Sequence, residues 1–295
     1  MDYEIRKEKI YNGETLAYRY KKGGEKTLLL IHGNMTSSKH WDLLMDVFDN
    51  EYTVYAVDMR GFGESTYINT FNSLSELSED INDLCRILKL RDLVVIGWST
   101  GGGVAMELAA AHPEKVKRLI LMESVGTKGY PILRKNEKGQ PVSGEYLVTK
   151  EEIASDPVQV LPILNAYASE NKEMLKAVWN AVIYNNNKPE DDKYDEYCDD
   201  MLTQKNLVDI DYSLVHFNIS SEFNGIKEGT GAAGRIKCPV LILWGKNDLV
   251  VPEYMALDIK KDIGYNAKLI YLENSGHSPI IDNIEQLLEK IYDFI

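Results

Sequence analysis

The most informative stretch of this sequence reads Leu93-Val94-Val95-Ile96-Gly97-Trp98-Ser99-Thr100-Gly101-Gly102-Gly103. Its first four residues are branched and apolar, which predicts a buried strand. Gly97, Ser99 and Gly101 then form the pattern G-x-S-x-G, and the residues that follow have the apolar spacing of a helix. The stretch therefore predicts a strand, a tight turn that carries Ser99, and a helix.

A serine on such a turn is held in a strained backbone conformation that exposes its hydroxyl group. The flanking glycines are needed because a side chain at either position would collide where the strand and the helix converge. The backbone amides at the start of the helix stabilise nearby negative charge. These are the properties of a nucleophile. Glycines and a serine also meet in turns by chance, so a base, an acid and an oxyanion hole must come from elsewhere in the chain.

The composition favours one large domain or a core domain with an insertion. The chain has 295 residues, of which 44% are hydrophobic, enough to bury a sizeable core. Its formal net charge of -13 at pH 7 makes nucleic acid and anionic membranes poor partners. We expect a monomer or a small homo-oligomer that binds a small-molecule substrate.

Other sequence signals favour a cytoplasmic protein without a bound metal. The N-terminal residues lack the apolar run of a signal peptide, and no segment approaches the ~18 apolar residues that a membrane span requires. The three cysteines are far apart, and no group of His, Cys, Asp and Glu has the spacing of a metal site. We therefore expect no membrane partner, no metal and no cofactor.

Strands and helices alternate along the chain on both sides of the Ser99 stretch. An Asn12-Gly13 turn between two alternating runs predicts an N-terminal hairpin. Buried strands are predicted at residues 27–31, 52–57, 93–96, 116–122, 239–244 and 267–272, with helical patterns between most of them. This order predicts an α/β fold, in which a mostly parallel twisted sheet has helices on both faces and functional residues at the carboxyl ends of its strands.

The alternation stops between residues 126 and 235, a segment too long to be a loop without structure of its own. Its sequence is polar with apolar groups that indicate helices, and we interpret its acidic run at residues 191–200 as a solvated face. Because the segment connects two strands of the sheet, we expect it to cover the carboxyl ends of the strands, near Ser99. The predicted domains are a core of residues 1–125 and 236–295 and a helical lid of residues 126–235.

Five short motifs occur in the order in which the α/β-hydrolase superfamily carries them: His32-Gly33, Asp58-x-Arg60-Gly61-x-Gly63-x-Ser65, Gly97-x-Ser99-x-Gly101, Gly245-x-x-Asp248 and Gly276-His277. Each motif is modest alone, but five in order at plausible spacing are highly specific. The chain therefore resembles this superfamily over essentially all of the predicted core. The resemblance implies an eight-stranded sheet with a lid insertion. In addition, the loop that starts at His32 is similar to the corresponding loop of haloalkane dehalogenases.

The resemblance also implies roles for individual residues. Ser99 is expected to be the nucleophile, and His277 the base that takes the proton of its hydroxyl group and later returns it to the leaving group. Asp248 would orient His277 and stabilise the imidazolium ion. Glu123 is the alternative acid, because it directly follows a predicted strand and some family members carry their acid at that place.

The oxyanion hole implied by the resemblance consists of the backbone N–H groups of Asn34 and Thr100. Thr100 directly follows the nucleophile, and Asn34 directly follows His32-Gly33. Each such donor contributes roughly 2.7–4 kcal/mol of transition-state stabilisation. Met35 and Trp98 are expected to line the substrate pocket, together with apolar groups of the lid.

A serine at the nucleophile position disfavours the chemistry of haloalkane dehalogenases, which use an aspartate there. We expect a serine hydrolase that cleaves a small to medium carboxylic ester, thioester or lactone through an acyl-enzyme. An acyltransferase, a cofactor-free perhydrolase and a C–C bond hydrolase could use the same triad. The alternative from another class is a ligand-binding, receptor-like protein built on a hydrolase fold.

Overall fold

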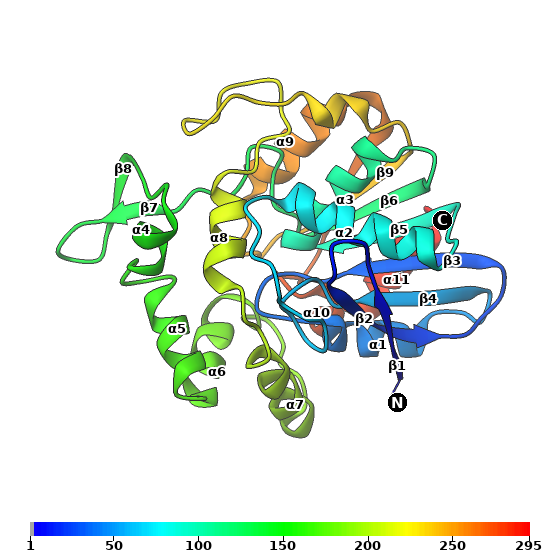
Figure 1. Cartoon of the computed structure of the whole chain (residues 1–295), viewed down its shortest axis with the longest axis horizontal. Coiled ribbons are helices and arrows are strands. Elements are labelled where there is room, and N and C mark those ends of the chain that lie inside the picture. Colours follow the sequence, from blue (N-terminus) through cyan, green and yellow to red (C-terminus); the bar gives the residue numbers. More distant parts are fainter. Residues whose placement is uncertain (1–2) are drawn as a thin grey trace.

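An eight-stranded sheet runs through the centre of the computed structural model, which describes residues 3–295 (Figure 1). The strands, in their order across the sheet, are β1 (Glu4–Lys9), β2 (Thr15–Lys21), β4 (Tyr52–Val57), β3 (Lys26–Ile31), β5 (Leu93–Trp98), β6 (Val116–Met122), β9 (Val240–Gly245) and β10 (Ala267–Leu272). β2 pairs antiparallel with β1 and with β4, and all other neighbours in this sheet are parallel. The expected mostly parallel sheet is confirmed. Met1 and Asp2, which the predicted core includes, lie outside the described residues.

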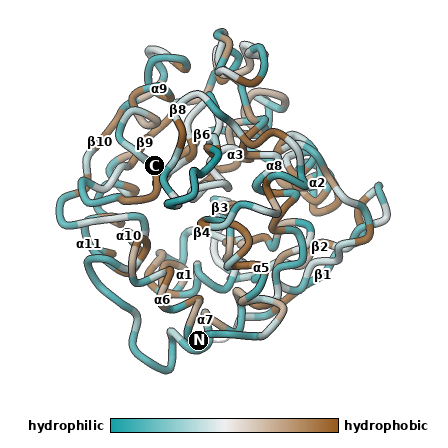
Figure 2. The backbone as a smooth tube through the Cα atoms, turned by 90° about the vertical axis from the view of Figure 1, so that its left-hand side faces the viewer, coloured by the Kyte–Doolittle hydropathy of each residue, from teal (hydrophilic) through white to brown (hydrophobic). Residues whose placement is uncertain are grey.

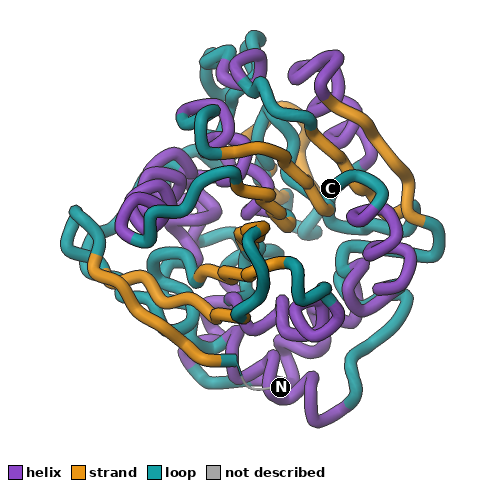
Figure 3. Tube along the Cα trace, turned by 90° about the vertical axis from the view of Figure 1, so that its right-hand side faces the viewer, coloured by secondary structure: helices purple, strands orange, loops and turns teal. Residues whose placement is uncertain are grey.

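Helices cover both faces of the sheet because successive residues of a strand point to opposite sides. In β3, Leu29 and Ile31 join one hydrophobic cluster, whereas Leu28 and Leu30 join another. The helices that contribute to the first cluster include α2 (Leu74–Ile87), α3 (Thr100–Ala111) and α9 (Glu253–Ile263), and those of the second include α1 (Asp42–Val47) and α11 (Ile284–Tyr292). Figures 1 and 3 show the resulting layers, with the strands between helices.

Within residues 3–295, three further short helices lie outside the inserted segment that is described below. They are η1 (Ser38–Trp41), η3 (Gly264–Asn266) and α10 (Pro279–Asp282). Many hydrophobic residues lie in the interior of the molecule, and many residues of the outer loops are hydrophilic (Figure 2). Within residues 3–295, no helix has the length and the apolar character that crossing a membrane would require.

The chain between β6 and β9 leaves the sheet and forms an inserted segment, residues 126–235, beside it (Figure 1). Its elements are β7 (Leu133–Lys135), β8 (Pro141–Tyr146), α4 (Lys150–Ala154), α5 (Leu161–Ala168), α6 (Lys172–Val182), α7 (Asp191–Met201), α8 (Leu207–Val215) and η2 (Ala232–Arg235). The antiparallel pair of β7 and β8 is a departure from the helical structure expected here. Both strands are largely exposed, so their sequences lack the apolar alternation that would have predicted them.

Candidate active site

Ser99 lies on the turn between β5 and α3, with φ 54° and ψ -119°. The turn is anchored by the backbone: Ser99 N–H donates to the carbonyl of Met122 at 3.0 Å, and Ser99 C=O accepts from Gly102 at 3.0 Å. The helix start packs tightly on the end of β3, because a Cβ atom on Gly101 would lie 2.2 Å from the carbonyl oxygen of Ile31. The local sequence thus holds Ser99 at positive φ, which non-glycine residues rarely adopt and which often marks a functional site.

His277 follows β10, and its ring is tied to Asp248, which follows β9. The distance from His277 Nδ1 to Asp248 Oδ2 is 2.9 Å, and only 2% of His277 is exposed. The other oxygen of Asp248 accepts backbone N–H groups from Val250 at 2.7 Å and Val251 at 3.0 Å. Burial alone would raise the pKa of Asp248, but the adjacent His277 and these hydrogen bonds hold it below its usual value.

Glu123, the alternative acid, is fully buried directly after β6 with φ 45°. Its carboxylate accepts the backbone N–H of Gly245, at 2.8 Å and 3.0 Å from its two oxygens. Burial and the negative charge of Asp248 raise the pKa of Glu123 well above its usual value. Both candidate acids therefore lie in one buried cluster, but the partner of the His277 ring is Asp248.

The loop after β3 approaches Ser99 closely and carries Asn34. A Cβ atom on Gly33 would lie 3.1 Å from the Cβ atom of Ser99. His32 fixes this loop, because its Nδ1 donates to the Gly33 carbonyl at 2.7 Å and its Nε2 accepts the Met59 N–H at 3.1 Å. Burial lowers the pKa of His32 to about 4, which keeps the ring neutral in this role.

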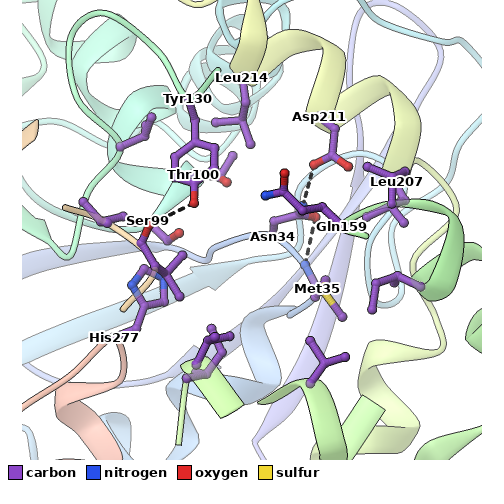
Figure 4. Close-up of a pocket in the computed structure, with 18 of the residues that line it drawn as sticks. Asn34, Met35, Ser99, Thr100, Tyr130, Gln159, Leu207, Asp211, Leu214 and His277 are labelled. Atoms are coloured by element: carbon purple, nitrogen blue, oxygen red, sulfur yellow. Dashed lines mark hydrogen bonds between the residues drawn. The ribbon is translucent and has the colours of Figure 1, made fainter. Parts of the chain in front are cut away.

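A cavity of about 200 Å³ opens beside Ser99 at the carboxyl ends of the parallel strands. Its lining residues are Asn34, Met35, Ser99, Thr100, Val125, Tyr130, Ile132, Gln159, Val160, Ile163, Val178, Trp179, Val182, Ile183, Leu207, Asp211, Leu214, Val250, Val251 and His277. Most of them are apolar, and many belong to the inserted segment, which therefore covers this end of the sheet. Ser99 and His277 lie next to each other on one side of the cavity (Figure 4).

The structure brings together the predicted residues Ser99, His277, Asn34, Thr100 and Met35 around this cavity. The expectation for Trp98 is wrong, because its side chain does not line the cavity and is 2% exposed. Its indole N–H donates instead to the backbone carbonyl of His277 at 2.8 Å. Trp98 is the last residue of β5 and packs in the second hydrophobic cluster. Its hydrogen bond therefore supports the loop that carries His277.

Three polar residues of the cavity were missed by the sequence analysis: Tyr130, Gln159 and Asp211. Asp211 lies on α8, and a signal for it exists in the sequence. The spacing of Leu207, Asp211 and Leu214 places all three on one helix face, and all three line the cavity. A carboxyl group on an otherwise apolar helix face is unusual, because burying it is costly.

Comparisons with known proteins identify the family of this chain. The sequence model of a family described as alpha/beta hydrolase fold matches residues 26–284. A 2-hydroxy-6-oxononadienedioate/2-hydroxy-6-oxononatrienedioate hydrolase of Cupriavidus pinatubonensis is 24% identical over 92% of this chain and 87% of its own. A pimeloyl-[acyl-carrier protein] methyl ester esterase of Aliivibrio fischeri is 24% identical over 95% of this chain and 98% of its own.

The fold is also shared with solved structures. An esterase from Exiguobacterium antarcticum superposes with a TM-score of 0.74 at 20% identity, covering 98% of both chains. A thermophilic esterase from Thermogutta terrifontis gives a TM-score of 0.72 at 18% identity, covering 99% of this chain and 97% of that one. At these identities the likeness concerns the fold.

Proposed function

Because this chain belongs to the alpha/beta hydrolase fold family, we propose that this hydrolase cleaves a small to medium carboxylic ester with Ser99 as its nucleophile. The observation that carries the proposal is the position of His277. Its ring is tied through Nδ1 to Asp248 and lines the same cavity as Ser99, which sits at positive φ at the start of α3. A strained serine, an oriented imidazole and a buried carboxylate are the components of an acyl-transfer triad.

In the proposed mechanism, the Nε2 atom of His277 accepts the proton of the Ser99 hydroxyl group as its oxygen attacks the ester carbonyl. Asp248 holds the Nδ1–H tautomer and stabilises the imidazolium ion. The N–H groups of Asn34 and Thr100 bind the oxyanion of the tetrahedral intermediate. His277 then protonates the leaving alcohol. In the second half of the reaction His277 accepts a proton from a water molecule that attacks the acyl-enzyme, and it returns this proton to Ser99 Oγ as the carboxylic acid is released.

The cavity supports a small, largely apolar substrate. Its volume of about 200 Å³ is below the roughly 300–1,000 Å³ of pockets that bind drug-sized ligands. Residues 126–235 act in this proposal as a lid over a core of residues 1–125 and 236–295. The lid limits the access of bulk water to the reacting groups and shapes the substrate site.

The relative from Cupriavidus is named as a hydrolase of a dicarboxylate. Cleavage of a C–C bond in a dicarboxylate by the same triad is the less favoured alternative function. A substrate carboxylate is bound most strongly by a cationic side chain, and no Lys or Arg of residues 3–295 lines the cavity. The ionisable group that faces Ser99 across the cavity is instead the acid Asp211.

The test of the proposal is the mass of the intact protein after treatment with a fluorophosphonate probe, which labels activated serines. We expect one adduct on the wild type and none on Ser99→Ala. Ser75→Ala, which changes an exposed serine of α2, serves as the matched control and should label like the wild type. A folded wild type that forms no adduct would favour the ligand-binding alternative. Rates with water, alcohols and peroxide as acceptors then separate hydrolysis from acyl transfer and perhydrolysis.

A further inference from the structure

Asp211 is the acidic side chain of the cavity wall and lies across the cavity from the proposed nucleophile. Figure 4 shows Ser99 and His277 on one side, Asp211 on the other, and Asn34 between them. Asp211 comes from α8 of the inserted segment, whereas Ser99 and Asn34 come from loops of the sheet. No step of the proposed mechanism uses this carboxyl group.

One oxygen of Asp211 is engaged by the protein and the other is left for a ligand. Asn34 Nδ2 donates to Asp211 Oδ1 at 3.1 Å. Within residues 3–295, Oδ2 has no hydrogen-bond partner, and no cation pairs with this carboxyl group. A carboxyl group in an apolar wall is retained at a cost, which a bound hydrogen-bond donor would offset.

The side-chain amide of Asn34 makes hydrogen bonds within the protein through both its oxygen and its nitrogen. Its Oδ1 accepts the backbone N–H of Met35 at 2.9 Å and Nε2 of Gln204 at 2.8 Å, while its Nδ2 holds Asp211. These contacts fix the Asn34 side chain, which engages Oδ1 of Asp211 and leaves Oδ2 without a partner among residues 3–295. The polar end of the cavity therefore offers the free oxygen of a carboxyl group, and a substrate hydroxyl group matches it because a hydroxyl group can both donate and accept.

We infer that Asp211 is a specificity-determining residue that binds a hydroxyl group carried by the substrate away from its ester bond. The inference rests on the proposed ester hydrolysis and names its substrate class as hydroxylated esters. A neutral hydroxyl group fits better than an ammonium group, because the rest of the wall is mostly apolar. Burial also raises the pKa of Asp211 to about 7, so that near neutrality the carboxyl group can both accept and donate.

The test compares matched esters that differ only at the remote end. Methyl 6-hydroxyhexanoate is compared with methyl 6-methoxyhexanoate, which keeps the oxygen and loses the donor, and with their shorter and longer homologues. A second series, 6-hydroxyhexyl and 6-methoxyhexyl acetate, places the group on the alcohol side. We expect kcat/KM to favour the hydroxyl ester by about tenfold or more in one of the two series.

Asp211→Asn makes the test sharper. Asn keeps a carbonyl oxygen for Asn34 and presents an NH2 group where Oδ2 was, so the acceptor becomes a donor. The hydroxyl-to-methoxy ratio should fall by about tenfold or more in this variant. Asp209→Asn is the matched control, because Asp209 lies on the same helix with its carboxyl group bound to Lys150 and Tyr67. The ratio should stay at the wild-type value there.

Binding to Ser99→Ala, measured by calorimetry, separates this inference from the proposed reaction. Tighter binding of a hydroxyl ester than of its methoxy partner supports the role of Asp211 even if no ester is hydrolysed. Equal rates and equal binding within both series would overturn it while leaving the esterase proposal intact. A larger preference for the corresponding amino esters than for the hydroxyl esters would likewise overturn the hydroxyl assignment.

Discussion

His277 and Asp248 are joined at 2.9 Å between Nδ1 and Oδ2, across the ends of two adjacent parallel strands, β10 and β9. Glu123 follows β6 and lies close to Asp248, but both of its carboxylate oxygens accept the backbone N–H of Gly245. This difference assigns the orienting role to Asp248 and a supporting role to Glu123 in the proposed mechanism.

Asp248→Asn should lower kcat for ester hydrolysis on the order of ten-thousandfold at neutral pH. An Asn side chain that donates to Nδ1 leaves the proton on Nε2, the atom that must accept the proton of Ser99. Initial rates with an ester that the wild type hydrolyses give kcat and KM for the variant. KM should change little, because Asp248 does not line the cavity.

Glu123→Gln is the comparison that distinguishes the two acids. Gln can still accept the Gly245 N–H, and burial already holds Glu123 toward its neutral form, so we expect kcat to change by less than about tenfold. If Glu123→Gln were the more damaging change and Asp248→Asn the milder one, the assignment of the acid would have to be reversed.

Gly101→Ala should distort the turn that carries Ser99. Its Cβ atom would lie 2.2 Å from the Ile31 carbonyl oxygen, so α3 must move away from β3. We expect a loss of about 1–3 kcal/mol in the free energy of unfolding, measured with urea, together with a loss of fluorophosphonate labelling. Gly234→Ala has open space around its Cβ atom and should be close to neutral in both measurements. Equal effects of the two changes would argue against the close packing.

The sheet and the placement of Ser99 could be predicted from the sequence because their signals are local. Strand, turn and helix follow one another within residues 93–111, and the turn glycines are adjacent to the serine. The choice between Asp248 and Glu123 could not be made this way. Both follow strand ends, and only the pairing of β6 with β9 shows that Glu123 faces the backbone of Gly245.

The cavity was harder to predict because it depends on how the inserted segment packs on the sheet. Trp98 and Met35 look equivalent in sequence, as apolar neighbours of site residues. Met35, with φ 57°, lines the cavity, whereas Trp98 lies beneath the His277 loop. Asp211 is separated from Ser99 by more than a hundred residues, and only the tertiary packing of α8 places both residues around one cavity.

Arg60 and Asp80 form a buried ion pair that should hold the loop after β4 in place. Arg60 Nε and Nη2 each donate to one oxygen of Asp80 at 2.7 Å, and each side chain is only 5% exposed. Arg60→Leu should destabilise the fold by about 3–5 kcal/mol, because it leaves the Asp80 charge buried and unpaired. Urea unfolding of the single and double variants measures this.

The double variant Arg60→Leu with Asp80→Leu provides the control for that prediction. It removes both charges, so its loss of stability should be clearly smaller than the sum of the two single losses. Strictly additive losses would mean that the two side chains contribute to stability independently of their ion pair.

Asp211 should make the protein less stable as the pH rises from about 4 to about 7. Burial and the charge of Asp156 raise the pKa of Asp211 from its ordinary value of 3.8 to about 7 in the folded state, against the opposing effect of the hydrogen bond from Asn34. At pH values between the pKa of Asp211 in the unfolded state and its pKa in the folded state, the folded state binds more protons. The free energy of unfolding therefore falls as the pH increases. Because a difference of one in pKa corresponds to about 1.36 kcal/mol, the free energy of unfolding can fall by at most roughly 4 kcal/mol over this pH range.

Asp211→Asn removes this titration while keeping an acceptor for Asn34. The variant should gain stability relative to the wild type between about pH 5 and pH 8, by about 1–2 kcal/mol because the cavity admits some solvent to Asp211. Urea unfolding at the two pH values measures the gain. Glu222→Gln is the control, because Lys128 and Lys261 lower the pKa of Glu222 to about 2, so its contribution is lost only in acid. Its stability difference from the wild type should therefore stay constant over this range, and a constant difference for Asp211→Asn as well would show that Asp211 titrates as an ordinary exposed carboxyl group.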